Sequence, residues 1–442
     1  MTSAFSSQLT RLYASASEAV LGVVEEIDAD SFLIEATSGS AQKASARFHE
    51  KLGFGFVLTN PRNRMFMATN RRLDLSVAVA RFVWMMSGSN RLADIAFYEP
   101  KVAGFTDDGF SVPGSSYGQR IFQSSPGIDQ LRAIISRINE DPNTRRATVS
   151  IYQPTDATRE SKDIPCTFGL MYHPRNGKLN ATTIMRSNNA IGLLQFNIFE
   201  FSMLAEVVAA EADLPIGEML HFAGSMHAFQ NHLESWGEGG KPKPIPTSVM
   251  EQMPSTPKPL AQITELIIFE AEMRHASASL RAAQAQTWIE RAQRSFDPYW
   301  QQFAFILLLA VAHKNGDAES WDVLRSLLRS AYTPFFPESK RPAGAGVKVD
   351  ASSITGDLFS FEEPPTITPI YSPAAKAKVL SLAQAYQERS GSTLRIEEFS
   401  AVQDVLLNRI AARGLDFESS ISESDFDDAL ENARDAIRNG DS

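Results

Sequence analysis

The stretch that most constrains the fold holds the only cysteine in 442 residues, Cys166. This cysteine follows a proline and precedes an apolar, strand-like run at residues 168–172. An Asn176-Gly177 pair, which is typical of a two-residue hairpin turn, joins that run to a second strand at 179–185. The sequence therefore predicts two paired strands, with Cys166 just before the first and Arg186 at the end of the second.

Two interpretations compete for Cys166. A free cysteine is most often a small buried hydrophobe, whereas a nucleophilic cysteine needs nearby cationic or hydrogen-bonding groups that stabilise its thiolate. The residues that favour the nucleophile are Arg145, Arg146, Arg186, Ser187, Asn197 and His227. Cationic groups suit an anion, an amide suits the edge of a base, and a thiol suits covalent attack. Together these residue types predict a nucleotide site.

The order of these short patterns resembles one enzyme family. The patterns are D-P-x-x-R-R at 141–146, P-C at 165–166, R-S-x-x at 186–189, F-N-I at 196–198 and H-x-F-x-N-H at 227–232. In this order they resemble thymidylate synthase and its relatives, the pyrimidine-nucleotide hydroxymethylases. The resemblance implies an α/β (α+β) fold, in which helices cover a mixed sheet. Helical periodicity further along the chain predicts an appended C-terminal helical domain.

The family's chemistry assigns the catalytic residues. In the family the thiolate adds to C6 of the pyrimidine, and C5 then attacks a one-carbon unit, here expected from methylenetetrahydrofolate. The resemblance therefore implies that Cys166 forms the covalent bond and that Arg186 lowers the pKa of its thiol. The product carries a methyl group after capture by hydride or a hydroxymethyl group after capture by water, and the sequence leaves both open.

The resemblance also implies how the pyrimidine nucleoside monophosphate is bound. Its phosphate would be held by Arg62, Arg145, Arg146, Arg186 and Ser187, its base by Asn197, and its sugar by His227 and Phe229. Arg64 is a second choice for the loop arginine. In the family's homodimer the arginine pair reaches the phosphate in the partner's site, so a homodimer is implied. For each arginine the alternative is a solvated or salt-bridged structural residue.

Asn197 and Phe229 bear on which nucleotide is bound. A side-chain amide both donates and accepts, so Asn197 suits the O4/N3 edge of uracil, although a flipped amide also meets cytosine. Phe229 stands where the family has a tyrosine that contacts the sugar. The missing phenol either loosens binding or makes room for the 2'-hydroxyl of a ribonucleotide, and the sequence leaves both open.

Three positions depart from the family's pattern. Arg81 stands where the family has the glutamate that organises water and proton transfer at the pyrimidine. Either Glu99 substitutes for that carboxylate, or the chemistry is altered, or catalysis is lost. Thr167 replaces a histidine, and Asn189 replaces an aspartate that helps to place the folate. The departures at Arg81, Asn189 and Phe229, with no match to the family's short apolar C-terminal tail, predict a specialised relative rather than an ordinary thymidylate synthase.

Composition divides the chain into five predicted segments. They are an N-terminal helical segment (1–48), the thymidylate-synthase-like core (49–245), a helical extension (246–333), a linker (334–374) and a C-terminal helical segment with an acidic end (375–442). A Gly- and Pro-rich run at 237–244 marks the end of the core. Helix-on-helix packing is expected for the extension, which also offers a surface for a dimer or another partner.

The formal net charge of −10 argues against a nonspecific grip on nucleic acid, which needs a broad basic face. One cysteine excludes an internal disulfide and suits a reducing cytosol. No signal-like run, membrane-spanning run or metal-ligand cluster stands out in the sequence. We therefore expect a cytoplasmic protein that binds its nucleotide without a metal, a nucleic-acid polymer or a membrane.

Two functions follow from these patterns. The first is a one-carbon transferase that acts at C5 of a pyrimidine nucleoside monophosphate. The second is a non-catalytic nucleotide-binding or regulatory protein whose helical extension contacts a partner. Retention of Cys166 with Arg186 favours the enzyme, whereas Arg81 favours the binding protein.

Overall fold

The computed structural model describes residues 11–35, 47–123, 128–238, 240–277, 282–342 and 422–439, with a few positions between 381 and 406. The chain forms two compact units, Met1–Ser353 and Ile354–Ser442. In the second unit the longest described element is α14 (Glu423–Asn439), whose Phe426 and Leu430 are buried. This helix confirms the last one predicted from the sequence, whereas most of the predicted linker lies outside the described residues. The segment boundaries drawn from the sequence stay predictions.

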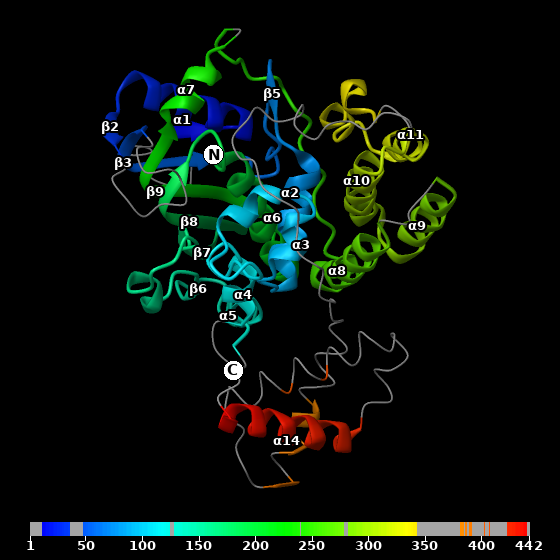
Figure 1. The fold of residues 1–442 in the computed structure, drawn as a ribbon. Helices are drawn as coiled ribbons and strands as arrows, with labels where there is room; N and C mark the ends of the chain where they lie inside the picture. The colour runs from blue at the N-terminus through cyan, green and yellow to red at the C-terminus, as the bar shows by residue number, and fades with distance from the viewer. Residues whose placement is uncertain are drawn as a thin grey trace. The chain divides into compact units, whose positions relative to one another are not determined.

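A mixed sheet forms one side of the first unit (Figure 1). In the described residues its strands follow the spatial order β1-β3-β9-β8-β7-β6, with β2 also paired to β3. Their bounds are β1 (Arg11–Tyr13), β2 (Phe32–Glu35), β3 (Arg47–Leu58), β6 (Ala147–Ser150), β7 (Thr167–Arg175), β8 (Lys178–Asn189) and β9 (Ile216–Phe229). The β1–β3 and β8–β9 pairs are parallel, and the other pairs are antiparallel. This arrangement confirms the predicted mixed sheet.

β7 and β8 form the hairpin that the sequence predicts. Asn176 and Gly177 at its turn have φ values of 54° and 71°, a left-handed conformation that asparagine and glycine adopt readily. At the other end of the hairpin Thr167 pairs with Met185. Because the chain continues by one residue beyond this pair on each strand, Cys166 and Arg186 lie side by side.

One long helix lies on the sheet, and a second helix packs on the first. α6 (Leu194–Glu211) packs against β8 and β9 and is buried almost all round, as its apolar sequence requires. α2 (Leu75–Ser87) packs against α6. The N-cap of α2 is Asp74, whose side chain accepts a backbone N–H. The helix ends at Gly88, whose φ of 69° is a left-handed conformation that glycine adopts readily.

Shorter elements complete this part of the unit. They are the helices α1 (Ala16–Ala29), α3 (Leu92–Ala96), α4 (Tyr117–Phe122), α5 (Gln130–Glu140) and α7 (Gln230–Trp236), the 3-10 helices η1 (Pro100–Gly104) and η2 (Pro154–Ala157), and the two-stranded sheet of β4 (Met67–Ala68) and β5 (Arg71–Arg72). In the N-terminal segment predicted to be helical, α1 begins at Ala16, because Arg11–Tyr13 pair with β3 as a strand.

The helical extension packs against α2 and α6. It consists of α8 (Pro259–Ala276), α9 (Ala282–Ser295), α10 (Pro298–Lys314) and α11 (Ala318–Leu327), which lie on the side of α2 away from the sheet (Figure 1). Trp300 and Phe303 of α10 and Trp321 of α11 are at most 1% exposed. They belong to the same apolar core as the sheet, which is the helix-on-helix packing that the sequence predicts.

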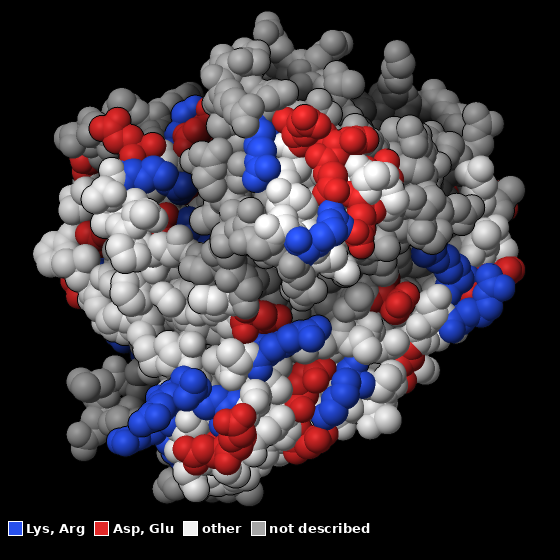
Figure 2. Space-filling view, turned by 90° about the horizontal axis from the view of Figure 1, so that it is seen from below, with Lys and Arg blue, Asp and Glu red and all other residues white. Residues whose placement is uncertain are grey.

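The surface carries both signs of charge. On the face shown in Figure 2, basic and acidic side chains are interspersed and each basic patch is small. Among the ion pairs of the described residues, Nη2 of Arg341 lies 2.7 Å from Oδ2 of Asp322. In the described ranges no helix is both long and apolar enough to cross a membrane. Those ranges also hold no group of three or more His, Cys, Asp or Glu side chains placed to bind a metal ion.

Candidate active site

Cys166 lies at the entrance to β7, partly exposed, and Arg186 lies beside it in β8. Nη2 of Arg186 is 3.9 Å from Sγ of Cys166. The same guanidinium donates to the carbonyl oxygens of Ile164 and Pro165, at 3.0 and 2.9 Å. The backbone N–H of Arg186 also donates to the carbonyl of Cys166 at 2.8 Å. The hairpin therefore holds a permanent positive charge next to the thiol.

The pKa of the Cys166 thiol reflects opposed influences. Burial raises this pKa above its ordinary value, Arg186 lowers it in part, and Asp163 raises it further. Arg186 lowers the pKa of Cys166, as the sequence predicts. Burial raises this pKa by more than Arg186 lowers it, so the prediction that the pKa lies below its ordinary value is wrong. The thiol form therefore dominates at neutral pH, and attack on a ligand requires the proton to leave the sulfur first.

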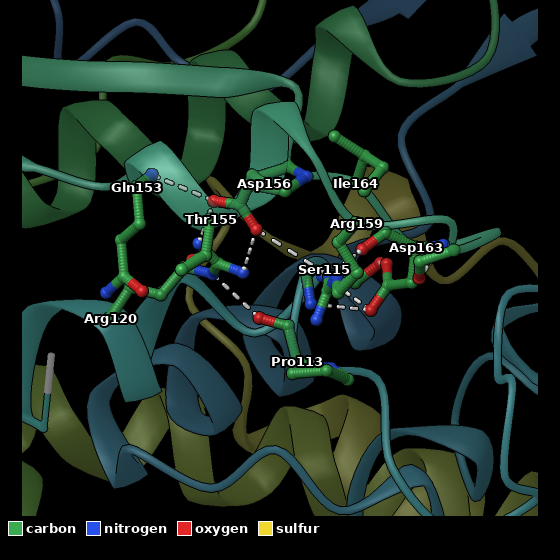
Figure 3. A network of polar contacts seen from close by, with 12 residues as sticks. Pro113, Ser115, Arg120, Gln153, Thr155, Asp156, Arg159, Asp163 and Ile164 are labelled. Carbon is green, nitrogen blue, oxygen red and sulfur yellow. Dashed lines mark hydrogen bonds and ion pairs between the residues drawn. The ribbon is translucent and has the colours of Figure 1, made fainter.

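The segment before Cys166 is anchored by Asp163 (Figure 3). The carboxylate of Asp163 accepts from the backbone N–H groups of Gly114 and Ser115 at 2.6 and 3.0 Å, and from the Ser115 hydroxyl at 2.5 Å. A side chain at position 114 is excluded, because a Cβ there would lie 1.9 Å from the carbonyl oxygen of Asp163. The loop that carries Gly114 thus fixes the backbone that precedes the cysteine.

A second anchor is the buried pair of Arg120 and Asp156 (Figure 3). Two nitrogens of Arg120 lie 2.6 and 2.9 Å from the two carboxylate oxygens, and its Nε donates to the carbonyl of Pro113 at 2.8 Å. Arg159 donates to the carbonyl of Asp163 at 2.8 Å and is also paired with Asp156, so it links the two anchors. Sequence reasoning missed this pair, because its two residues lie 36 positions apart along the chain.

Ser187, His227 and Phe229 lie on adjacent strands close to Arg186. Oγ of Ser187 in β8 is 3.2 Å from Nδ1 of His227 in β9. The rings of His227 and Phe229 meet edge to face, with centroids 5.4 Å apart. Burial and the charge of Arg186 lower the pKa of His227 to about 4, so its imidazole is neutral at physiological pH. The structure thus brings three of the predicted substrate-binding residues together with the Cys166–Arg186 pair.

Asn197 is buried in the first turn of α6, with 2% of its surface exposed. Its Oδ1 accepts from Nδ2 of Asn188 at 2.9 Å, and Oδ1 of Asn188 lies 2.8 Å from Nε2 of His221. Burial lowers the pKa of His221 to about 3, so its ring is neutral. These three side chains form a chain of hydrogen bonds inside the core, from His221 through Asn188 to Asn197, here called the relay. Sequence reasoning missed Asn188 and His221, whose only signal was a polar residue at an interior strand position.

Arg81 of α2 lies between two carboxylates, with 12% of its side chain exposed. Its Nε lies 2.5 Å from Oε1 of Glu200, and its Nη1 lies 2.8 Å from Oε2 of Glu99. Burial lowers the pKa of Arg81, but the two carboxylates outweigh burial and raise it. Glu99, which the sequence suggested as a substitute carboxylate, is thus engaged by Arg81. Sequence reasoning missed Glu200, because this residue lies within an otherwise apolar run.

The other two departures from the family pattern also have structural roles. Thr167 is fully buried at the start of β7. Asn189 caps the turn that leads into α6, because its Oδ1 accepts from the backbone N–H groups of Ile191 and Gly192 at 3.1 and 2.9 Å. The side-chain oxygen of Asn189 is therefore committed to the turn, and its amide nitrogen is the group that remains for a ligand.

Arg62 is not brought to this group of residues. It follows β3 beyond Leu58, which pairs with Met219 near the start of β9. Ser187, in contrast, pairs with Ser225 near the end of β9. Arg62 therefore lies toward the opposite end of the sheet from the Cys166–Arg186 pair, and the sequence-based assignment of this residue to the phosphate is corrected. The position of Arg62 follows from the register of β3 against β9, which the sequence does not reveal.

Both loop arginines are held by other parts of the protein. Nη1 of Arg62 donates to the carbonyl of Met250 at 3.3 Å. Arg64 is fully buried and forms an ion pair with Glu206 of α6. The second choice for the phosphate is therefore a core residue.

Arg145 and Arg146 are exposed and immediately precede β6. β6 pairs with β7 so that Ala147 faces Tyr172, whereas Ser150 faces Gly169. The arginine pair therefore lies at the end of β7 away from Cys166. Within a single chain these two arginines do not reach the cysteine.

Fold and site together define an α/β protein with a cysteine–arginine pair at the open end of a β-hairpin and a buried amide beside it. The family with this arrangement is thymidylate synthase. The model of that family matches residues 50–266, from β3 into α8, and the chain belongs to the thymidylate synthase superfamily.

Two curated relatives illustrate the similarity. Deoxyuridylate hydroxymethyltransferase of Bacillus phage SP01 is 30% identical over 185 residues, covering 38% of this chain and 47% of the relative. Thymidylate synthase of Listeria monocytogenes serotype 4a (strain HCC23) is 32% identical over 149 residues, covering 32% of this chain and 47% of the relative. The chain thus spans about half the length of the curated relatives it matches.

Proposed function

We propose that this protein is a one-carbon transferase that acts at C5 of a pyrimidine nucleoside monophosphate, with methylenetetrahydrofolate as the donor. The observation that carries the proposal is the 3.9 Å approach of Arg186 Nη2 to Cys166 Sγ in a chain of this superfamily. Relatives named thymidylate synthase and deoxyuridylate hydroxymethyltransferase support the reaction class. They leave both a methyl and a hydroxymethyl product open.

In the proposed reaction the thiol of Cys166 loses its proton and its sulfur forms a bond to C6 of the pyrimidine. The electron pair of the C5–C6 double bond moves toward C5 and the C4 carbonyl, so that C5 becomes a nucleophile. Methylenetetrahydrofolate would supply the one-carbon unit, whose carbon would bond to C5. As the proton leaves C5, the bond from that carbon to the folate nitrogen would break and tetrahydrofolate would depart, leaving a methylene group on C5. Hydride from tetrahydrofolate would convert this group to methyl, or water would convert it to hydroxymethyl, and cleavage of the sulfur–C6 bond would then restore Cys166. Arg186 favours the first step because its charge stabilises the thiolate.

The same strands supply contacts for phosphate and sugar. Arg186 and Ser187 would hold the phosphate through charge-assisted and hydroxyl hydrogen bonds. The neutral ring of His227 would bind a sugar hydroxyl. Phe229 adds an apolar ring edge and no hydrogen bond, so ribose and deoxyribose substrates are both to be tested.

The relay through Asn188 supports a uracil base. With Nε2 of His221 protonated, Oδ1 of Asn188 accepts from it and Nδ2 donates to Oδ1 of Asn197. This orientation directs the NH₂ group of Asn197 away from Asn188 and toward the carboxyl group of Glu200, which accepts one hydrogen bond from it. The second hydrogen of this group can donate to the O4 of uracil. Cytosine carries an amino group at the same position and would place two donors against each other.

A homodimer is part of the proposal. Arg145 and Arg146 are exposed at the end of β7 remote from their own Cys166. They are therefore suited to reach the phosphate in a second copy of the chain, as the family resemblance implies. We also retain a cytoplasmic location as a proposal, because the single cysteine needs no oxidising compartment.

The decisive experiment measures tritium release from nucleotides labelled at C5. The protein is incubated with methylenetetrahydrofolate and dUMP, UMP, dCMP or CMP, and Cys166→Ala serves as the paired variant. We expect release from a uracil nucleotide by the wild-type protein and none by the variant. Normal turnover by Cys166→Ala would remove the covalent mechanism.

The second candidate function is a nucleotide-binding protein without turnover. It is favoured by Arg81, whose charge replaces a carboxylate, and by the burial that raises the pKa of Cys166. In that case the wild-type protein binds a pyrimidine nucleotide tightly, as calorimetry would show, yet releases no tritium from any of the four substrates.

A further inference from the structure

Glu200 lies on the same face of α6 as Asn197. The two residues are three positions apart, which places their side chains one above the other on a helix. Both are almost fully buried, with 3% and 2% of their surfaces exposed. Any base that contacts the amide of Asn197 therefore comes close to the carboxyl group of Glu200.

The carboxyl group of Glu200 has one bound and one unbound oxygen. Oε1 accepts from Nε of Arg81 at 2.5 Å. Oε2 is buried and has no hydrogen-bond partner among the described residues. A buried carboxyl oxygen without a hydrogen-bond partner is unfavourable unless it is protonated or contacts a ligand. Oε2 is therefore the atom of this cluster that is available to a bound base.

Arg81, Glu99 and Glu200 form a cluster with one more negative than positive group. Two carboxylates that share one guanidinium cannot both stay ionised at low cost, so the cluster favours retaining one proton. Burial raises the pKa of Glu200, Glu99 raises it further, and Arg81 and Asn197 lower it in part. Glu200 is the more buried of the two acids, at 4% against 19% side-chain exposure, and so takes the proton.

Tyr117 links this cluster to the thiol. Burial raises the pKa of the Tyr117 hydroxyl, and the charges of Cys166 and Glu200 raise it further, whereas Arg81 lowers it. Its ring stacks on Phe201 of α6, with centroids 5.8 Å apart. The hydroxyl of Tyr117 therefore lies within electrostatic reach of both the sulfur and the Glu200 carboxyl, which places these groups around one region of the interior.

We propose that Glu200 is a further catalytic residue of this site, and that Arg81 positions it. As the sulfur of Cys166 bonds to C6, the π electrons shift to the C4 carbonyl, and protonated Glu200 donates its proton to O4 through Oε2. When the sulfur–C6 bond breaks, the Glu200 carboxylate takes the proton back. The inference rests on the proposed function. It adds a proton donor, Glu200, from α6, and a cation, Arg81 of α2, that positions this donor.

Two glutamine variants, Glu200→Gln and Glu99→Gln, test the proposal. Glu206→Gln is the matched control. Glu206 is also buried in α6 and paired with an arginine, but that arginine is Arg64, away from Cys166. Glu200→Gln is expected to lower tritium release by about 100-fold or more, the usual contribution of a general acid, with the nucleotide Kd changed by less than about threefold. Glu206→Gln is expected to retain release per folded molecule.

The pH profile separates proton transfer from a structural role. Activity that needs protonated Glu200 falls as pH rises through the pKa of this residue. Glu99→Gln removes a charge that raises this pKa, so the alkaline limb of the profile moves to lower pH. The groups that face Glu200 are Arg81, Glu99, Tyr117 and Asn197, and Glu206→Gln leaves all of them in place. Full activity of Glu200→Gln across the pH range, or an alkaline limb that does not move in Glu99→Gln, would overturn the proposal.

A binding measurement decides the matter if the wild-type protein lacks turnover. Calorimetry of dUMP binding between pH 5 and pH 9 reports protons exchanged with the base. A weakening of affinity at high pH that Glu200→Gln abolishes and Glu206→Gln preserves supports contact between Glu200 and O4. The same pH dependence in Glu200→Gln refutes that contact, independently of whether the transferase function holds.

Discussion

Nδ2 of Asn188 donates to Oδ1 of Asn197 at 2.9 Å, and both side chains are at most 2% exposed. Asn188→Leu should therefore free the Asn197 amide to turn over and meet either base. We expect the preference for dUMP over dCMP, measured as a ratio of Kd values, to fall by about five- to tenfold, since one orienting hydrogen bond contributes about 1 kcal/mol.

Asn180→Ala is the matched control for this change. Asn180 is buried in the same strand, and its Oδ1 accepts from the backbone N–H of Glu218. The control should lose stability without any change in base preference. An unchanged Kd ratio in Asn188→Leu would show that the relay does not orient Asn197.

Arg186 should control the reactivity of the single cysteine. The charge of Arg186 lowers the pKa of Cys166, so Arg186→Gln raises that pKa further above its ordinary value. Because only the thiolate reacts, alkylation by iodoacetamide should slow by about three- to tenfold at pH 8, and its pH profile should move to higher pH. Since the chain has one cysteine, labelling reports on this site alone. Arg175→Gln, at the far end of β7, should leave the profile unchanged.

The Arg120–Asp156 pair should stabilise the loop before Cys166. Arg120→Met leaves the buried carboxylate of Asp156 with only the longer contact to Arg159, at 3.6 Å. We expect a loss of about 3 kcal/mol in the free energy of unfolding measured with urea. Arg132→Met, at an arginine whose side chain is 79% exposed, is the control and should change stability by less than about 1 kcal/mol. Equal stability of both variants would contradict the anchoring role.

Acid should weaken the same anchor. Burial raises the pKa of Asp156, but Arg120 and other donors outweigh burial and hold this pKa below its ordinary value. A depressed pKa gives stability that is present above the unfolded-state pKa and is lost as pH falls through the folded-state value. Urea midpoints of the wild-type protein should therefore drop below about pH 4, and Arg120→Met should lose this part of the acid dependence.

Arg145 and Arg146 should act in a partner's site. Neither Cys166→Ala nor a double Arg145→Glu/Arg146→Glu variant should turn over alone. After the two are mixed and allowed to exchange subunits, about one quarter of the wild-type sites should return, because half of the dimers are mixed and each has one intact site. Tritium release measures the recovery. No recovery in mixtures that sedimentation shows to contain mixed dimers would exclude sharing of the arginines.

The sequence by itself determined features that are written locally along the chain. The Asn176-Gly177 turn followed from the left-handed backbone that these residues favour, and the apolar helices followed from their periodicity. The order of the short motifs was enough to identify the superfamily, which the family match confirms.

Only the tertiary structure decided which distant residues meet. Arg81 and Glu200 are 119 positions apart, and their pairing depends on how α2 packs against α6. Arg62 was wrongly assigned to the phosphate, because it lies toward the opposite end of the sheet from Cys166. The register of β3 against β9, which places Arg62 there, is set by packing and not by the residues next to Arg62. Local preferences act through a few neighbouring dihedral angles, whereas a buried contact is fixed by the whole set of elements around it.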